Sequence, residues 1–81
     1  MKIEDIKKIL KDGEEIEFKY DNKEFSITFF EEKGKTKLSF CEFYKNPIDA
    51  DTIDEILEID YNGKTVKYML EQIEKKDIII Y

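Results

Sequence analysis

The chain has 81 residues, which is the size of one small domain with a single hydrophobic core. It contains no His, no Arg and no Trp, so its 14 basic residues are all lysines, and 20 acidic residues give it a net charge of −6. Without His it lacks the side chain that titrates near neutral pH, and without Arg it lacks the planar group suited to bidentate phosphate contacts. This composition argues against acid–base catalysis and against nucleic-acid binding.

The single cysteine and the lack of long apolar stretches exclude further classes of protein. Cys41 is the only cysteine, which excludes an internal disulfide and a thiolate metal site. No stretch approaches the roughly 20 apolar residues of a membrane-spanning helix, and the first residues do not resemble a signal peptide. We therefore expect a cytoplasmic protein without a membrane partner, in which residues 1–81 form a single domain.

The first part of the chain changes from helical to strand periodicity. Apolar residues recur every three or four positions over Ile3–Lys11, which predicts a short helix that ends at Asp12-Gly13. Apolar and charged residues then alternate over 16–20 and again over 25–29. This alternation predicts two half-buried strands joined by a tight turn at residues 21–23.

A third strand is predicted over Thr36–Tyr44, after a turn at Lys33-Gly34-Lys35. Leu38 and Phe40 lie on the face that the two preceding strands bury. Phe30 and Phe43 lie on the opposite face, so that face is not purely polar. We expect a small element to cover its far end.

The last third of the chain predicts two helices and a final strand. Pro47 ends the three-stranded meander, and Asp51 is the expected N-cap of a short helix. An Asn62-Gly63 turn precedes a helix predicted over Thr65–Lys75, and the β-branched run Ile78–Ile80 is expected to form an edge strand. The order α-β-β-β-α-α-β predicts an α+β fold, with helices on one face of an antiparallel sheet of three to four strands.

Residue types that carry chemistry are few and isolated. Cys41 is the only soft nucleophile, and no His is present to activate it. Neither a glycine-rich phosphate motif nor a nucleophile elbow occurs. The aromatic strands suggest an RNA-stacking sheet, but their rings alternate inward with aliphatic residues in an acidic chain. We therefore expect a protein that is not an enzyme, with no catalytic residue, metal site, bound cofactor or nucleic-acid partner.

The net charge is concentrated in one segment. Residues 49–60 hold six acidic residues and no lysine, whereas the remaining 14 acids and 14 lysines cancel. The spacing Asp49-x-Asp51 opens like a calcium-binding loop, but Asp54 occupies the sixth position, where glycine is required. Two interpretations remain: a solvated helix face favoured by the helix dipole, or a surface that binds a partner.

If the segment binds a partner, four of its residues are the candidates. Asp51, Asp54, Glu55 and Glu58 are spaced by three, four and seven positions, which places them on one face of a helix. Ile53, Ile56 and Leu57 would then turn inward and anchor that helix.

Two segments carry a resemblance to known proteins. One is Gly13-Glu14-Glu15-Ile16-Glu17-Phe18-Lys19-Tyr20 after the first amphipathic helix, and the other is Ile59-Asp60-Tyr61-Asn62-Gly63-Lys64-Thr65-Val66 before the last helix. Together they resemble small uncharacterised proteins of Gram-positive bacteria and their phages. This chain has Asp-Asn-Lys where those proteins often have an Asn-Gly turn. The resemblance implies a bacterial or phage origin and brings no established activity with it.

Charge, composition and resemblance together favour a small acidic, non-enzymatic domain that acts as a protein–protein interaction module. Its partner is expected to be a protein, and the negative charge favours a basic one. The chain itself is expected to be a monomer or weak homodimer. The alternative is an acidic inhibitor or nucleic-acid mimic that occupies a basic groove of another protein.

Overall fold

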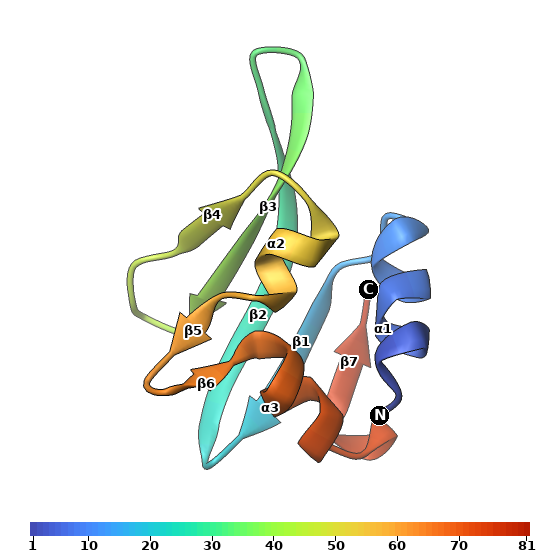
Figure 1. Cartoon of the computed structure of the whole chain (residues 1–81), viewed down its shortest axis with the longest axis vertical. Coiled ribbons are helices and arrows are strands. Elements are labelled where there is room, and N and C mark those ends of the chain that lie inside the picture. The colour runs from blue at the N-terminus through green and yellow to red at the C-terminus, as the bar shows by residue number, and fades with distance from the viewer.

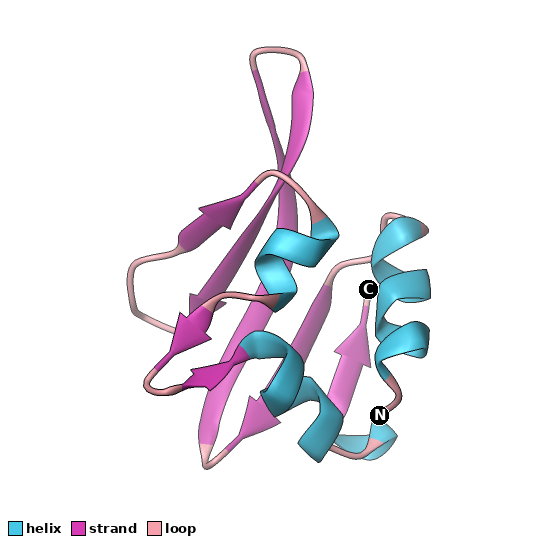
Figure 2. Ribbon diagram, in the orientation of Figure 1, coloured by secondary structure: helices cyan, strands magenta, loops and turns pink.

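The computed structural model describes residues 1–81 as an antiparallel sheet with three α-helices on one face (Figure 1, Figure 2). The elements in chain order are α1 (Ile3–Lys11), β1 (Ile16–Tyr20), β2 (Lys23–Glu32), β3 (Lys35–Glu42), β4 (Ile48–Ala50), α2 (Ile53–Leu57), β5 (Asp60–Tyr61), β6 (Lys64–Thr65), α3 (Val66–Gln72), the 3-10 turn η1 (Lys75–Asp77) and β7 (Ile78–Ile80). The strand order of the five-stranded sheet is β4-β3-β2-β1-β7, and β5 pairs only with β6. The predicted α+β class is confirmed.

The sheet is larger than the three to four strands predicted, because β4 extends it. Ala50 pairs with Leu38 and Ile48 with Phe40, both on β3. β4 has only three residues and directly follows Pro47, so it is too short to show an alternating pattern in the sequence. The edge position expected for the isoleucine run is confirmed, since β7 pairs with β1 at the other side of the sheet.

Three two-residue turns set the register of the hairpins. They are formed by Asp21-Asn22, Lys33-Gly34 and Asn62-Gly63, and all six residues have φ between +52° and +85°. Positive φ at both central residues defines the turn whose twist matches that of antiparallel strands. The first turn is one residue shorter than predicted, because Lys23 already pairs with Tyr20.

The core lies between the sheet and the helices, and all of its buried residues are apolar. The rings of Phe18, Phe25 and Phe40 stack at its centre, with centroids 5.3 to 6.4 Å apart. The prediction that inward-facing strand residues pack opposite the helices is confirmed by the buried set: Ile6, Leu10, Ile16, Phe18, Phe25, Ile27, Leu38, Phe40, Ala50, Ile56, Leu57, Val66, Met69, Leu70, Ile73 and Ile78.

Several element ends differ from the predicted ones. The third strand ends at Glu42, because the N–H of Lys45 donates to the Glu42 carbonyl and closes a turn in which Tyr44 has φ +69°. The last helix ends at Gln72, short of Lys75. Ile73 adopts an extended backbone (φ −90°, ψ 157°), which buries its side chain and directs the chain towards β7.

The second face of the sheet carries no helix, so the covering element expected there is absent (Figure 2). Its centre is lined by small, half-buried side chains: Ser26 lies opposite Cys41, and Thr28 lies opposite Ser39. The Cys41 thiol donates to the carbonyls of Glu42 and Lys45 at 3.1 and 3.2 Å. Hydroxyl and thiol groups at a water-exposed sheet face can remain hydrated, so this face needs no cover. None of the helices combines the length and the apolar composition needed to cross a membrane.

Tyr61 closes one side of the aromatic core. Its ring meets Phe25 and Phe40 edge-on, with centroids 5.8 and 5.4 Å away. Its hydroxyl donates a 2.5 Å hydrogen bond to Glu42 Oε1. This hydrogen bond, together with burial and the Glu42 charge, raises the pKa of Tyr61 to about 12.

Replacing Tyr61 by Phe should lower the free energy of unfolding by about 1.5–3 kcal/mol, the usual contribution of a hydrogen bond to a charged group. Because folding raises the pKa from 10.0 to about 12, the stabilisation is complete below pH 10 and is lost as the pH rises towards 12. A hydrogen bond to Glu17 also raises the pKa of Tyr81, so the titration is done in a Tyr81→Phe background. Absorbance titration should then show one phenol that ionises near pH 12, and adding Tyr61→Phe should abolish it. Tyr44→Phe, which removes only the hydroxyl of a fully exposed tyrosine, should retain it. A late ionisation that persists when Tyr61→Phe is combined with Tyr81→Phe would contradict this assignment.

Candidate functional site

Helix α2 presents apolar and acidic residues on opposite sides. Ile56 and Leu57 are buried in the core, whereas Asp54, Glu55 and Glu58 are exposed. The inward anchoring predicted for this helix is therefore confirmed. The carboxylates of the first turn lie near the positive end of the helix dipole, so α2 tolerates them without a nearby cation on the same helix.

The N-cap of α2 is Thr52, and the prediction of Asp51 at this position is wrong. Thr52 Oγ1 accepts a hydrogen bond from the N–H of Glu55 at 3.1 Å. The Asp51 carboxylate instead contacts Lys37 on β3, with 3.3 Å between Nζ and Oδ1. The ion pair draws the Asp51 side chain towards the sheet, and the adjacent threonine supplies the cap.

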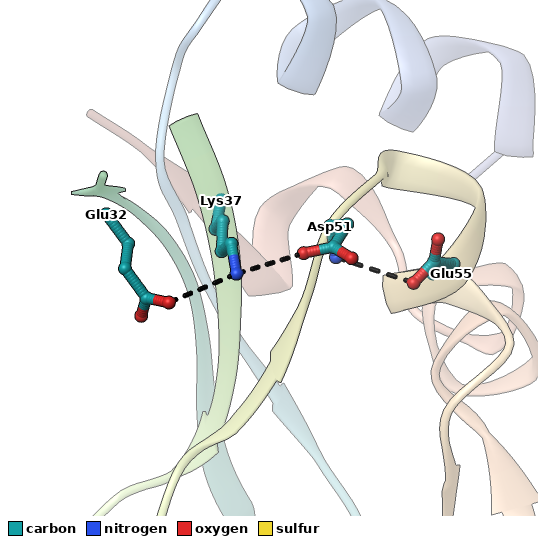
Figure 3. A network of polar contacts seen from close by, with 4 residues as sticks. All are labelled: Glu32, Lys37, Asp51 and Glu55. Carbon is teal, nitrogen blue, oxygen red and sulfur yellow. Dashed lines mark hydrogen bonds and ion pairs between the residues drawn. The ribbon is translucent and has the colours of Figure 1, made fainter. Parts of the chain in front are cut away.

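A chain of polar contacts joins Asp51 to three other elements, β2, β3 and α2 (Figure 3). Lys37 Nζ lies between the carboxylates of Asp51 and Glu32, and its distance to Glu32 Oε1 is 3.2 Å. The N–H of Asp51 donates to Glu55 Oε2 at 3.5 Å. Asp51 therefore lies beside α2 and not on the predicted helical face, yet it stays next to Glu55.

We call Asp51, Asp54, Glu55 and Glu58 the acidic surface. Lysines on neighbouring elements neutralise only part of its negative charge. Lys37 pairs with Asp51, and Lys7 of α1 pairs with Asp54 at 3.4 Å. Glu55 and Glu58 have no lysine partner. The hydrogen bonds that Lys37 donates to the carboxylates of Glu32 and Asp51 raise the pKa of Lys37 above its ordinary value, so this lysine remains charged at physiological pH.

A shallow acidic hollow of about 280 Å³ opens next to α2. Four carboxylates and one ammonium group line it, which leaves three negative charges. Its lining residues are Glu32, Lys37, Asp49, Ala50, Asp51 and Glu55.

Two residues of the hollow, Glu32 and Lys37, lie outside the acidic segment found from the sequence. The β2–β3 register puts Lys37 opposite Phe30, so Lys37 and Glu32 share one face of the hairpin. Once the two-residue turn at Lys33-Gly34 is placed, the alternation of the two strands predicts this proximity. The turn predicted from the sequence is one residue longer and gives another register, so it does not predict the contact between Lys37 and Glu32.

The acidic surface is suited to binding cations that belong to another macromolecule. No three Cys, Asp or Glu side chains are arranged to hold a metal ion, and no polar side chain is buried. Exposed carboxylates accept short, charge-assisted hydrogen bonds from lysine and arginine side chains. A basic protein surface offers these donors in the required number.

No family model matches the chain, and no curated protein or solved structure is significantly similar to it. The resemblance to small proteins of Gram-positive bacteria and their phages therefore stays a prediction.

Proposed function

We propose that this chain is a small, non-enzymatic, cytoplasmic protein–protein interaction module whose acidic surface binds a basic protein. The observation that carries the proposal is the pair Glu55 and Glu58: both are exposed and neither has a lysine partner. Glu55 lies on α2 and Glu58 is its C-cap, and the opposite side of this helix is fixed by Ile56 and Leu57 in the core. Charges held on an anchored helix bind a partner with little loss of conformational freedom.

The distribution of charge supports a partner of opposite sign. The net charge of −6 equals the charge of residues 49–60, because the rest of the chain sums to zero. A one-sided negative potential attracts and orients a positively charged partner, and it raises the rate of association at low salt. This steering favours a basic protein over a neutral one.

The neighbouring lysines support binding by fixing two of the carboxylates. Asp51 and Asp54 each contact one lysine through the Oδ1 atom. A carboxylate has about four acceptor positions on its two oxygens, so both groups can still accept hydrogen bonds from a partner. Exposed ion pairs contribute at most about 1 kcal/mol to stability, so their main effect here is to orient Asp51 and Asp54.

The test is a charge reversal with a matched control. The double variant Glu55→Lys, Glu58→Lys changes the net charge from −6 to −2, because each substitution changes it by two. The control Glu4→Lys, Glu71→Lys makes the same change at exposed positions outside the acidic surface, where neither glutamate has a lysine partner. Asp54 is kept, because a lysine there would face Lys7. Each exposed substitution should change the free energy of unfolding by about 0.5 kcal/mol or less.

We expect wild type and control to retain the same basic partner from the host lysate, and the Glu55→Lys, Glu58→Lys variant to lose it. Association of the wild type should slow steeply as the salt concentration rises. Equal retention by all three proteins would show that the acidic surface is only solvated. A partner from which DNA displaces the chain would assign the surface to nucleic-acid mimicry.

A further inference from the structure

Strand β7 is an edge strand whose outer side is unpaired. In its register with β1, Ile79 lies opposite Glu17. The N–H of Tyr81 donates to the Glu15 carbonyl at 2.9 Å, so the backbone groups of residues 79 and 81 point towards β1. Those of residues 78 and 80 therefore point away from the sheet.

The outward backbone groups of β7 include free donors and acceptors. The N–H of Ile78 donates to the Lys75 carbonyl within η1. The carbonyl of Ile78 and both the N–H and the carbonyl of Ile80 have no hydrogen-bond partner in the chain. One donor and two acceptors thus remain available along this edge.

The side chains of this edge are apolar and accessible. Ile79, on the helix-free face, is 55% exposed, and Tyr81 is 62% exposed. Ile80 faces the helix side, where α1 lies at the β7 end of the sheet (Figure 1). Its exposure of 38% shows that α1 leaves the end of β7 uncovered.

The two edges of the sheet differ in how well they are protected against pairing with another strand. β4 directly follows Pro47 and carries Asp49, and both proline and charge discourage further strand pairing. β7 consists of three isoleucines and contains neither a charge nor a proline. Only the β7 edge is therefore open to another strand.

We propose that β7 pairs antiparallel with β7 of a second copy across a two-fold axis at Ile79. In this register the N–H of Ile80 donates to the Ile78 carbonyl of the second copy, and the symmetric bond forms in return. Ile79 lies opposite its own copy on the helix-free face, and Ile80 lies next to Ile78 of the second copy on the core side. The free N–H of Ile80 and the free carbonyl of Ile78 thus satisfy each other across identical strands, as an isologous interface requires. The Ile80 carbonyl has no donor in the second copy and stays hydrated, because the Ile78 N–H is bound to Lys75.

The match of apolar side chains favours an axis at Ile79, because all three isoleucines of one strand then lie opposite isoleucines of the other. An axis at Ile80 would leave Ile78 without an opposite residue. With the axis at Ile79, Asp77 faces the uncharged Tyr81 of the second copy, and no like charges are directly opposed. An axis at Ile78 would place Asp77 against Ile79 and reduce the apolar contact. The three-residue strand buries far less than the roughly 1,200 Å² of a stable interface, so the dimer should be weak and concentration-dependent.

The test is disulfide trapping in a Cys41→Ser background, which removes the native thiol. Directly opposed residues that share no hydrogen bonds have Cβ atoms about 4.5–5.5 Å apart, within small adjustment of a disulfide. Ile79→Cys should therefore form a covalent dimer under mild oxidation. In the matched variant Ile80→Cys, the two thiols are offset by two residues along the strands, and cross-linking should be about tenfold slower.

A second variant tests the pairing without a cysteine. Ile79→Lys places two like charges directly opposite each other and should abolish the dimer seen by sedimentation at about 1 mM protein. The monomer should keep its circular dichroism spectrum, because Ile79 is exposed. A wild type that stays monomeric at this concentration would overturn the proposal. Equal cross-linking of Ile79→Cys and Ile80→Cys would overturn it too, because random collision would then explain both.

Discussion

Replacing Phe40 by Ala should lower the free energy of unfolding by about 3–5 kcal/mol. Phe40 is completely buried on β3, in the interior of the sheet. Its ring contacts those of Phe18, Phe25 and Tyr61, with centroids 5.4 to 6.4 Å away. Removing the ring leaves a cavity at the junction of these three rings. Since small domains are stable by only about 5–15 kcal/mol, much of the chain should unfold at physiological temperature.

Thermal and urea unfolding followed by circular dichroism measure this effect. Ser39→Ala is the matched control, because it truncates the adjacent residue on the helix-free face and should change stability by about 0.5 kcal/mol or less. A Phe40→Ala midpoint within about 4 °C of the wild type corresponds to no more than 1 kcal/mol. Such a result would contradict the central position of Phe40 in the core.

The inward-facing residues could be predicted because their periodicity is local. The alternation in β1, β2 and β3 identifies Phe18, Ile27 and Phe40 as core residues, and the helical stripe of α3 identifies Leu70. β4 could not be predicted, because its three residues after Pro47 gain their conformation from pairing with β3. Strand formation there depends on a partner that is distant in the sequence.

In the candidate site, too, some features could be predicted from neighbouring residues in the sequence, whereas others depend on residues that are distant in the sequence. The exposure of Asp54, Glu55 and Glu58 follows from the burial of Ile56 and Leu57 on the same short helix. The lysine contacts could not be predicted from a local pattern, because Lys7 and Lys37 come from other elements. These contacts determine which carboxylates remain uncompensated, so they decide which residues the binding test changes.

Ending the chain at Asp77 should prevent folding into a soluble monomer. β7 pairs with three residues of β1 and contributes the buried side chain of Ile78. Without it, Ile16 and Phe18, both buried in the full chain, would lie on an open edge strand. An apolar edge of this kind templates pairing with other chains, so we expect aggregation together with loss of the native fold.

Two control proteins separate this structural role of β7 from its proposed pairing with a second copy. A chain that lacks only Tyr81 loses one 2.9 Å backbone hydrogen bond to Glu15 and should fold, at a cost of about 1 kcal/mol. Ile79→Lys changes an exposed side chain and should also fold, as a monomer. The soluble fraction, gel filtration and circular dichroism compare all three with the wild type. If the chain ending at Asp77 is a soluble, folded monomer, the sheet is stable without β7, and the edge strand serves only the contact between copies.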